Sequence, residues 1–151
     1  MAIFMEFERL PYRITTDTSH FDVLGMYRYL SEESYWGTGI SLDQFDRAIK
    51  NSLVFGLFLE DKQLGMGRVI TDYATFAYLK DVFVLAEYQK KGLGRWLLEC
   101  ILNHPALENV ARWQLQTLDA QRLYGEYGFR PLDYPRFHME RLFIPSGDSE
   151  S

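Results

Sequence analysis

Three cations surround two glycines in residues 87–97, EYQKKGLGRWL. An apolar run, VFVL, precedes this segment and a helix-like pattern follows it, so the glycines stand where a strand leads into a helix. A helix N-terminus presents unpaired N–H groups and a positive dipole end, and glycine has no Cβ to keep an anion away. The segment therefore predicts a bound phosphate or pyrophosphate. The cations and glycines are Lys90, Lys91, Gly92, Gly94 and Arg95.

Two common nucleotide-binding motifs fail at this joint. A dinucleotide fingerprint needs a third glycine where the chain has Leu97, and a P-loop needs Lys and then Ser or Thr where the chain has Arg95 and Trp96. On the two glycines alone, a solvated turn at a helix start is the better interpretation. More of the chain is needed to distinguish the two possibilities.

The elements that must position this joint form a mixed α/β pattern, with strands first in an antiparallel meander and then in one strand–helix–strand crossover. The predicted strands are 12–16, 53–59, 64–71, 76–85, 113–118 and 136–143. The predicted helices are 19–30, capped by Ser19, one that starts after Ser41, 93–102 and 120–127. The apolar face expected of the third helix comprises Leu93, Trp96, Leu97, Cys100 and Ile101.

The composition favours one globular domain over residues 1–144, with a polar, flexible tail at 145–151. A formal net charge of −5 argues against general nucleic-acid binding. The single cysteine, Cys100, cannot form an internal disulfide and fits a reducing cytoplasm. No signal peptide and no apolar run of membrane-spanning length is visible, so we expect no membrane association.

Two motifs together resemble the GNAT (Gcn5-related N-acetyltransferase) superfamily. Gln89-x-x-Gly92-x-Gly94 is similar to the family's acyl-CoA motif Q/R-x-x-G-x-G/A, and residues 123–129, LYGEYGF, are similar to its L-Y-x-x-x-G-F. The order of the predicted elements is also similar to the family's. The chain departs from the common pattern at Ala86, where many members have proline, and at Thr117, where many have asparagine.

This resemblance implies a GNAT fold, a central mixed sheet flanked by helices, and transfer of acetyl from acetyl-CoA to an amine. It implies that backbone amides of the glycine segment hold the pyrophosphate. It also implies that the amides of the preceding strand contact the pantetheine arm and acetyl group beside a bulge. The implied cofactor-binding residues are Phe83, Val84, Leu85, Gln89, Lys90, Lys91, Gly92, Leu93, Gly94, Arg95, Thr117 and Ala120.

The resemblance also implies a catalytic acid. Tyr124 of the second motif corresponds to the family's tyrosine beside the coenzyme sulfur, and a phenol with a pKa near 10 is protonated at neutral pH. The alternative is an aromatic side chain that only packs against the sheet. Cys100 falls on an apolar helix face, so no covalent enzyme intermediate is expected.

Asp81 lies inside an apolar strand, where a charge is costly unless it is paired. By resemblance to small-amine members of the family, it faces the acceptor and attracts an ammonium group or assists its deprotonation. The alternative is an ion pair with Arg68 or Lys80 on the sheet. The sequence leaves both interpretations open.

The resemblance also implies that loops wall the acceptor site, and Trp36, Tyr73 and Asp72 lie in the matching loops. Anchoring of Trp36 onto the core is the alternative. A small primary amine is the leading acceptor, and a protein N-terminus or lysine is the second. A protein that binds acyl-CoA without turnover remains a third possibility. The three histidines show no metal-site spacing, so no metal is expected, and the resemblance implies that a homodimer is common.

Overall fold

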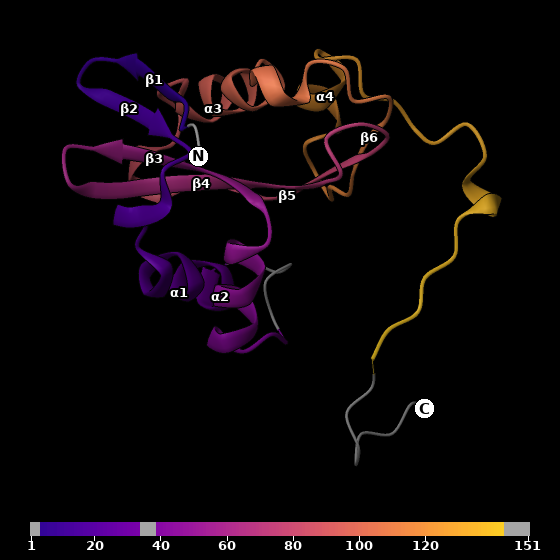
Figure 1. Ribbon diagram of the computed structural model, residues 1–151, viewed down its shortest axis with the longest axis horizontal. Coiled ribbons are helices and arrows are strands. Elements are labelled where there is room, and N and C mark those ends of the chain that lie inside the picture. Colours follow the sequence, from indigo (N-terminus) through magenta and orange to yellow (C-terminus); the bar gives the residue numbers. More distant parts are fainter. Residues whose placement is uncertain (1–3, 34–38, 144–151) are drawn as a thin grey trace. The chain divides into compact units, whose positions relative to one another are not determined.

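A computed structural model describes residues 4–33 and 39–143 of the chain (Figure 1). The chain divides into two compact units, Met1–Gln116 and Thr117–Ser151, and the expectation of one domain over residues 1–144 stays a prediction. None of the helices in the described part of the chain has the length and apolar character needed to span a bilayer.

The first unit is built on a six-stranded mixed sheet in which the strands follow one another in chain order. The first five strands pair antiparallel, and the sixth lies parallel to the fifth. This confirms the mixed sheet with one parallel joint. The strands are β1 (Glu6–Arg9), β2 (Tyr12–Thr15), β3 (Leu53–Leu59), β4 (Lys62–Thr71), β5 (Ala77–Val84) and β6 (Trp113–Leu115).

Helices cover both faces of this sheet (Figure 1). One face carries α1 (Val23–Glu33) and α2 (Leu42–Lys50), whose apolar residues Met26 and Phe45 pack with Met66 and Phe83 of the sheet. The other carries α3 (Leu93–Leu102), on which all five residues expected on its apolar face are buried. Short 3-10 helices complete the unit: η1 (Thr18–His20), η2 (Ala86–Tyr88) and η3 (Pro105–Leu107).

Side-chain caps set the starts of α1 and α2. Ser41 and Gln44 form the capping box of α2, which confirms the predicted start of that helix. The predicted cap of the first helix, Ser19, is wrong. Asp17 caps a 3-10 turn there, and Asp22 accepts the Gly25 N–H at 3.0 Å, so α1 begins only at Val23.

The strands differ from prediction at both ends of the chain. β1 was not predicted, because its sequence, EFER, is mostly polar and lies at the exposed edge of the sheet. The predicted strand 136–143 is wrong. Pro135 fixes φ and has no N–H, so Pro135–Phe137 forms the 3-10 helix η4, and the rings of Tyr134 and Phe137 stack at 4.9 Å.

The second unit contains a short α-helix, α4 (Gln121–Gly125). The motif LYGEYGF forms the end of this helix and the turn that follows it, where Gly128 adopts a φ of 93°. Phe129 then donates its N–H to the Tyr124 carbonyl at 3.2 Å, and the two rings meet edge to face at 5.7 Å. The motif is thus a self-contained helix-and-turn that fixes the backbone of Tyr124.

Candidate active site

A β-bulge interrupts the pairing of β4 with β5. Met66 pairs with Phe83 and Arg68 with Lys80, so one residue of β4 lies opposite two of β5, Asp81 and Val82. Asp81 takes a left-handed φ of 55°, a conformation that aspartate tolerates better than most residues. The bulge that the family resemblance implied is therefore present, and Asp81 lies in it.

Beyond the bulge, the far edge of β5 is open. The β5–β6 ladder consists of Ala77, Tyr78 and Leu79, and no other strand in residues 4–33 or 39–143 pairs with that edge. Leu85 N–H donates to the Leu64 carbonyl of β4 at 2.7 Å. Because backbone groups alternate along a strand, the N–H and C=O of Val84 point away from β4, toward this edge. Val84 thus presents an N–H donor where no strand uses it.

The Val84 carbonyl on the same edge is held by a side chain. Gln89 follows η2 and donates its Nε2 to that carbonyl at 2.7 Å. The glutamine of the Q-x-x-G-x-G motif therefore ties the end of β5 to the turn that leads into α3. Lys90 comes next, with a left-handed φ of 65°. This geometry fixes the path of the chain into the two glycines.

The N-terminus of α3 meets the requirements of an anion site. Gly92 is its N-cap with a φ of 80° and no side-chain cap, and the first bond along the helix runs from Trp96 N–H to the Gly92 carbonyl at 3.1 Å. The amides of Leu93 and Gly94 precede that bond and point out of the helix end. A Cβ at Gly94 would meet only Val84 Cγ2, at 3.8 Å, so no packing within the chain requires glycine there.

Positive charge gathers at the same turn, where Lys90, Lys91 and Arg95 are exposed. A glycine that packing does not require, uncapped amides and these cations fit a phosphate-bearing ligand that closely approaches the backbone. The Val84 edge adjoins this helix start through the Val84–Gly94 approach. An extended ligand with an anionic group at α3 can therefore run along the edge of β5.

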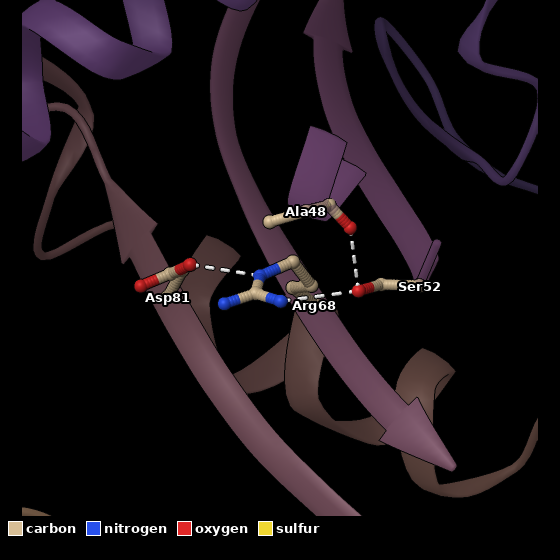
Figure 2. Close-up of polar contacts among 4 residues, drawn as sticks. All are labelled: Ala48, Ser52, Arg68 and Asp81. Carbon is tan, nitrogen blue, oxygen red and sulfur yellow. Dashed lines mark hydrogen bonds and ion pairs between the residues drawn. The ribbon is translucent and has the colours of Figure 1, made fainter. Parts of the chain in front are cut away.

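Asp81 is paired rather than open to solvent. Its Oδ2 accepts the Arg68 Nε–H at 2.9 Å (Figure 2), and both side chains are less than a tenth exposed. Arg68 Nη1 also donates to Ser52 Oγ at 3.1 Å, and Ser52 donates to the Ala48 carbonyl at 2.7 Å. The ion-pair interpretation of Asp81 is therefore the one the structure shows, with Arg68 and not Lys80 as its partner.

The loop residues expected to wall an acceptor differ from one another. Trp36 lies outside the described residues. Asp72 accepts N–H groups of Ala74, Thr75 and Phe76, and these hydrogen bonds, led by the one from the Thr75 hydroxyl, hold its pKa far below the usual range. Its carboxylate thus shapes the β4–β5 turn. Tyr73 next to it is half exposed, with a φ of 64°.

Other candidate groups have structural partners. Cys100 is buried and its pKa is raised to about 11 by burial, so the thiol is a poor nucleophile. His104 accepts the Ala106 N–H on Nδ1 at 3.0 Å and caps η3. Among the described residues, no three His, Cys, Asp or Glu side chains are grouped to hold a metal ion.

Tyr124, Thr117 and Ala120 belong to the second unit. Burial raises the pKa of the Tyr124 phenol above its ordinary value, so it is protonated at neutral pH. Thr117 accepts the Ala120 N–H on Oγ1 at 3.0 Å and so organises the start of α4. Thr117, which departs from the family's asparagine, thus holds Ala120, the N-cap residue of the Tyr124 helix.

Sequence reasoning missed two residues beside the bulge. Ser52 follows α2 and bridges Arg68 to that helix, a contact that no sequence pattern signals. Tyr29 of α1 stacks on Phe83 with ring centroids 4.5 Å apart and planes 18° apart. An aromatic residue in an amphipathic helix gives no indication of which strand it will contact.

Comparison with known proteins supports the same family. The family model described as "Acetyltransferase (GNAT) domain" matches residues 50–131. A protein of Gibberella zeae named "Putative acetyltransferase FG08082" is 34% identical over 140 residues, covering 78% of each chain.

Solved structures agree. A crystal structure of a protein from Xanthomonas campestris pv. campestris, described as belonging to the GNAT family, is 42% identical, with a TM-score of 0.84 over 87% of this chain and 93% of that one. A GNAT family acetyltransferase from Elizabethkingia anophelis, solved with acetyl-CoA bound, is 15% identical with a TM-score of 0.62 over 90% of both chains and shows the fold alone. The chain belongs to the GNAT acetyltransferase family.

Proposed function

We propose that the protein transfers the acetyl group of acetyl-CoA to the nitrogen of a small primary amine. One observation carries the proposal: the open edge of β5 at Val84 adjoins an uncapped helix start at Gly92 and Gly94. Acetyl-CoA has a pyrophosphate, which suits the helix start. It also has an extended amide-bearing arm that ends in a thioester, which suits the open edge of β5.

Each part of acetyl-CoA has a matching feature in the protein. The pyrophosphate lies on the amides of residues 92–95, with Lys90 and Lys91 supplying charge. The arm runs along the backbone of Phe83, Val84 and Leu85. By the family resemblance, Thr117 and Ala120 are also cofactor-binding residues. Acetyl-CoA supplies an acetyl group already activated as a thioester.

Two groups of the protein donate hydrogen bonds or protons during the transfer. Val84 N–H donates to the acetyl carbonyl oxygen and stabilises negative charge that develops on it. Tyr124 holds its phenol proton at neutral pH and passes it to the departing sulfur. The amine attacks the thioester carbonyl directly, because the Cys100 thiol is buried and its pKa is raised to about 11. As the C–N bond forms and the C–S bond breaks, the amine nitrogen loses a proton to water, and water returns a proton to Tyr124 after CoA departs.

The proposed acceptor site includes the β4–β5 turn. Tyr73 supplies an aromatic side chain suited to a small amine, and Asp72 orders the turn that carries Tyr73. A protein N-terminus or lysine is the alternative acceptor. The single cysteine fits work in a reducing cytoplasm.

The test is calorimetric titration with acetyl-CoA, run beside CoA and ADP, followed by thiol-release assays with a panel of small amines and peptides. Micromolar binding that requires the pantetheine arm, with turnover of a small amine, supports the proposal. Turnover of peptides alone would replace the small amine by a protein acceptor. Binding with no turnover of any amine would favour an acyl-CoA sensor, and no binding at millimolar acetyl-CoA would overturn the proposal.

A further inference from the structure

A buried arginine, Arg68, lies next to the bulge on the α2 side of the sheet. Arg68 is 6% exposed and its register partners are Val54 on β3 and Lys80 on β5. A guanidinium in such a position is unfavourable unless its donors are satisfied. Arg68 meets this requirement with an ion pair to Asp81 and a hydrogen bond to Ser52 (Figure 2).

The network joins three elements around the bulge. Asp81 belongs to β5, Arg68 to β4, and Ser52 connects them to the Ala48 carbonyl in the last turn of α2. That helix end carries the negative pole of the dipole, which favours a nearby guanidinium. The pair is therefore tied to a fixed helix end, so the bulge cannot shift without breaking bonds to both neighbours.

The bulge lies upstream of the Val84 edge. Asp81 and Val82 are its two residues on β5, and Phe83 resumes the ladder opposite Met66. Removing the extra residue from the bulge would reverse which edge each following amide faces, because backbone groups alternate along a strand. The direction of the Val84 N–H thus depends on Asp81 keeping its φ of 55°.

We propose that Arg68 is a positioning residue: its ion pair with Asp81 holds the β5 bulge that directs Val84 N–H to the open edge, and Asp81 serves this structure rather than accepting the amine's proton. The inference rests on the proposed function only for its catalytic consequence. Its structural content, the direction of the Val84 amide, holds whatever ligand binds.

Two variants separate positioning from proton transfer. Asp81→Asn keeps an oxygen for Arg68 and tolerates a left-handed φ, so it removes the charge with little change of backbone. We expect kcat to fall three- to tenfold, whereas loss of a general base costs about 100-fold or more. Arg68→Met/Asp81→Leu removes both charges and puts a residue that disfavours positive φ in the bulge. We expect kcat to fall at least 30-fold while the Kd for acetyl-CoA stays within threefold.

The double variant also separates positioning from stability, since apolar replacement of a whole buried pair is often neutral or stabilising. The matched control is Asp46→Asn, which breaks the exposed Lys50–Asp46 pair on α2 and should leave kcat, Kd and Tm unchanged. A kcat loss of 100-fold in Asp81→Asn would make Asp81 the base and overturn the inference. So would wild-type kcat in the double variant.

A structural readout distinguishes this inference from the proposed function. In ¹H–¹⁵N spectra without ligand, the double variant should shift the amides of Val82, Val84 and Leu85 and speed hydrogen exchange at Leu85, while amides of β2 stay in place. Unchanged amides at these positions would overturn the inference even if the protein proves to have no acetyltransferase activity. If the wild type neither binds nor turns over acetyl-CoA, the proposed function falls, and these amide shifts decide the positioning role alone.

Discussion

Gln89 Nε2 donates to the carbonyl of Val84 at 2.7 Å, so the first residue of the glycine motif is bonded to the last residue of β5. The two halves of the candidate cofactor site are thereby joined by one side chain: the open strand edge, and the helix start with its uncapped amides. A site built from local sequence, residues 84–95, needs few long-range contacts to be assembled.

We expect that removing the hydrogen bond from Gln89 to the Val84 carbonyl lowers the affinity for acetyl-CoA. Gln89→Ala should weaken acetyl-CoA binding about five- to tenfold, a figure in line with a net hydrogen bond of about 1 kcal/mol. Titration calorimetry measures it. Glu87→Gln, an exposed neighbour on η2, is the control and should bind as the wild type does. Equal affinity of Gln89→Ala and wild type would contradict a role for this bond.

The two glycines of the motif should respond in opposite directions to alanine. Gly92 has a φ of 80°, so Gly92→Ala should destabilise the protein by about 1–2 kcal/mol. Gly94 is helical and unobstructed, so Gly94→Ala should be neutral or stabilise by up to about 1 kcal/mol. Urea unfolding measures both free energies.

A larger side chain at Gly94 should instead change the affinity for acetyl-CoA. Gly94→Val places a branched side chain beside the helix amides and should weaken acetyl-CoA binding at least tenfold while the protein stays folded. If Gly94→Val binds acetyl-CoA with wild-type affinity, the glycine is not reserved for the ligand.

Tyr124→Phe should lower kcat at least tenfold and leave the Kd for acetyl-CoA nearly unchanged, because it removes only a proton donor. Burial raises the Tyr124 pKa, and the acid role needs the protonated phenol, so its contribution to kcat should persist beyond the pH at which an ordinary tyrosine ionises and be lost only at still higher pH. The measurement is kcat against pH for both proteins. Unchanged turnover in Tyr124→Phe would remove Tyr124 from the mechanism.

Asp72 predicts a pH effect on stability. Its pKa is depressed by the hydrogen bonds it accepts, so its contribution is present above the ordinary aspartate value and lost as pH falls below it. Asp72→Asn should therefore lower Tm at pH 7, and the gap from wild type should narrow between pH 5 and pH 2. A gap that stays constant over this range would show that the ionised carboxylate does not stabilise the turn.

The sequence predicted those parts of the site that are set locally. Apolar periodicity gave all of α3, and the glycines with their flanking cations marked its start. Ser41 marked the start of α2, because a cap is defined by residues three positions apart. Such features need no knowledge of the rest of the fold.

What sequence could not predict depends on distant partners. The choice between an acceptor-facing and a paired Asp81 depends on register and a bulge that bring Arg68, thirteen residues away, beside it. The expected strand at 136–143 had a suitable pattern, but Pro135 starts a 3-10 turn and no ladder forms there. The polarity pattern of a segment shows that it is compatible with a strand, but the strand forms only if the edge of a neighbouring strand is available to pair with it.

The most direct test of the proposed site is a titration of ¹⁵N-labelled protein with acetyl-CoA, followed by ¹H–¹⁵N spectra. We expect the largest shifts at the amides of Val84, Leu93 and Gly94, with small shifts on β2 and β3, and weaker shifts at Val84 when ADP replaces acetyl-CoA. Saturating acetyl-CoA that leaves these three amides unmoved would contradict the site, and with it the proposed acetyl transfer.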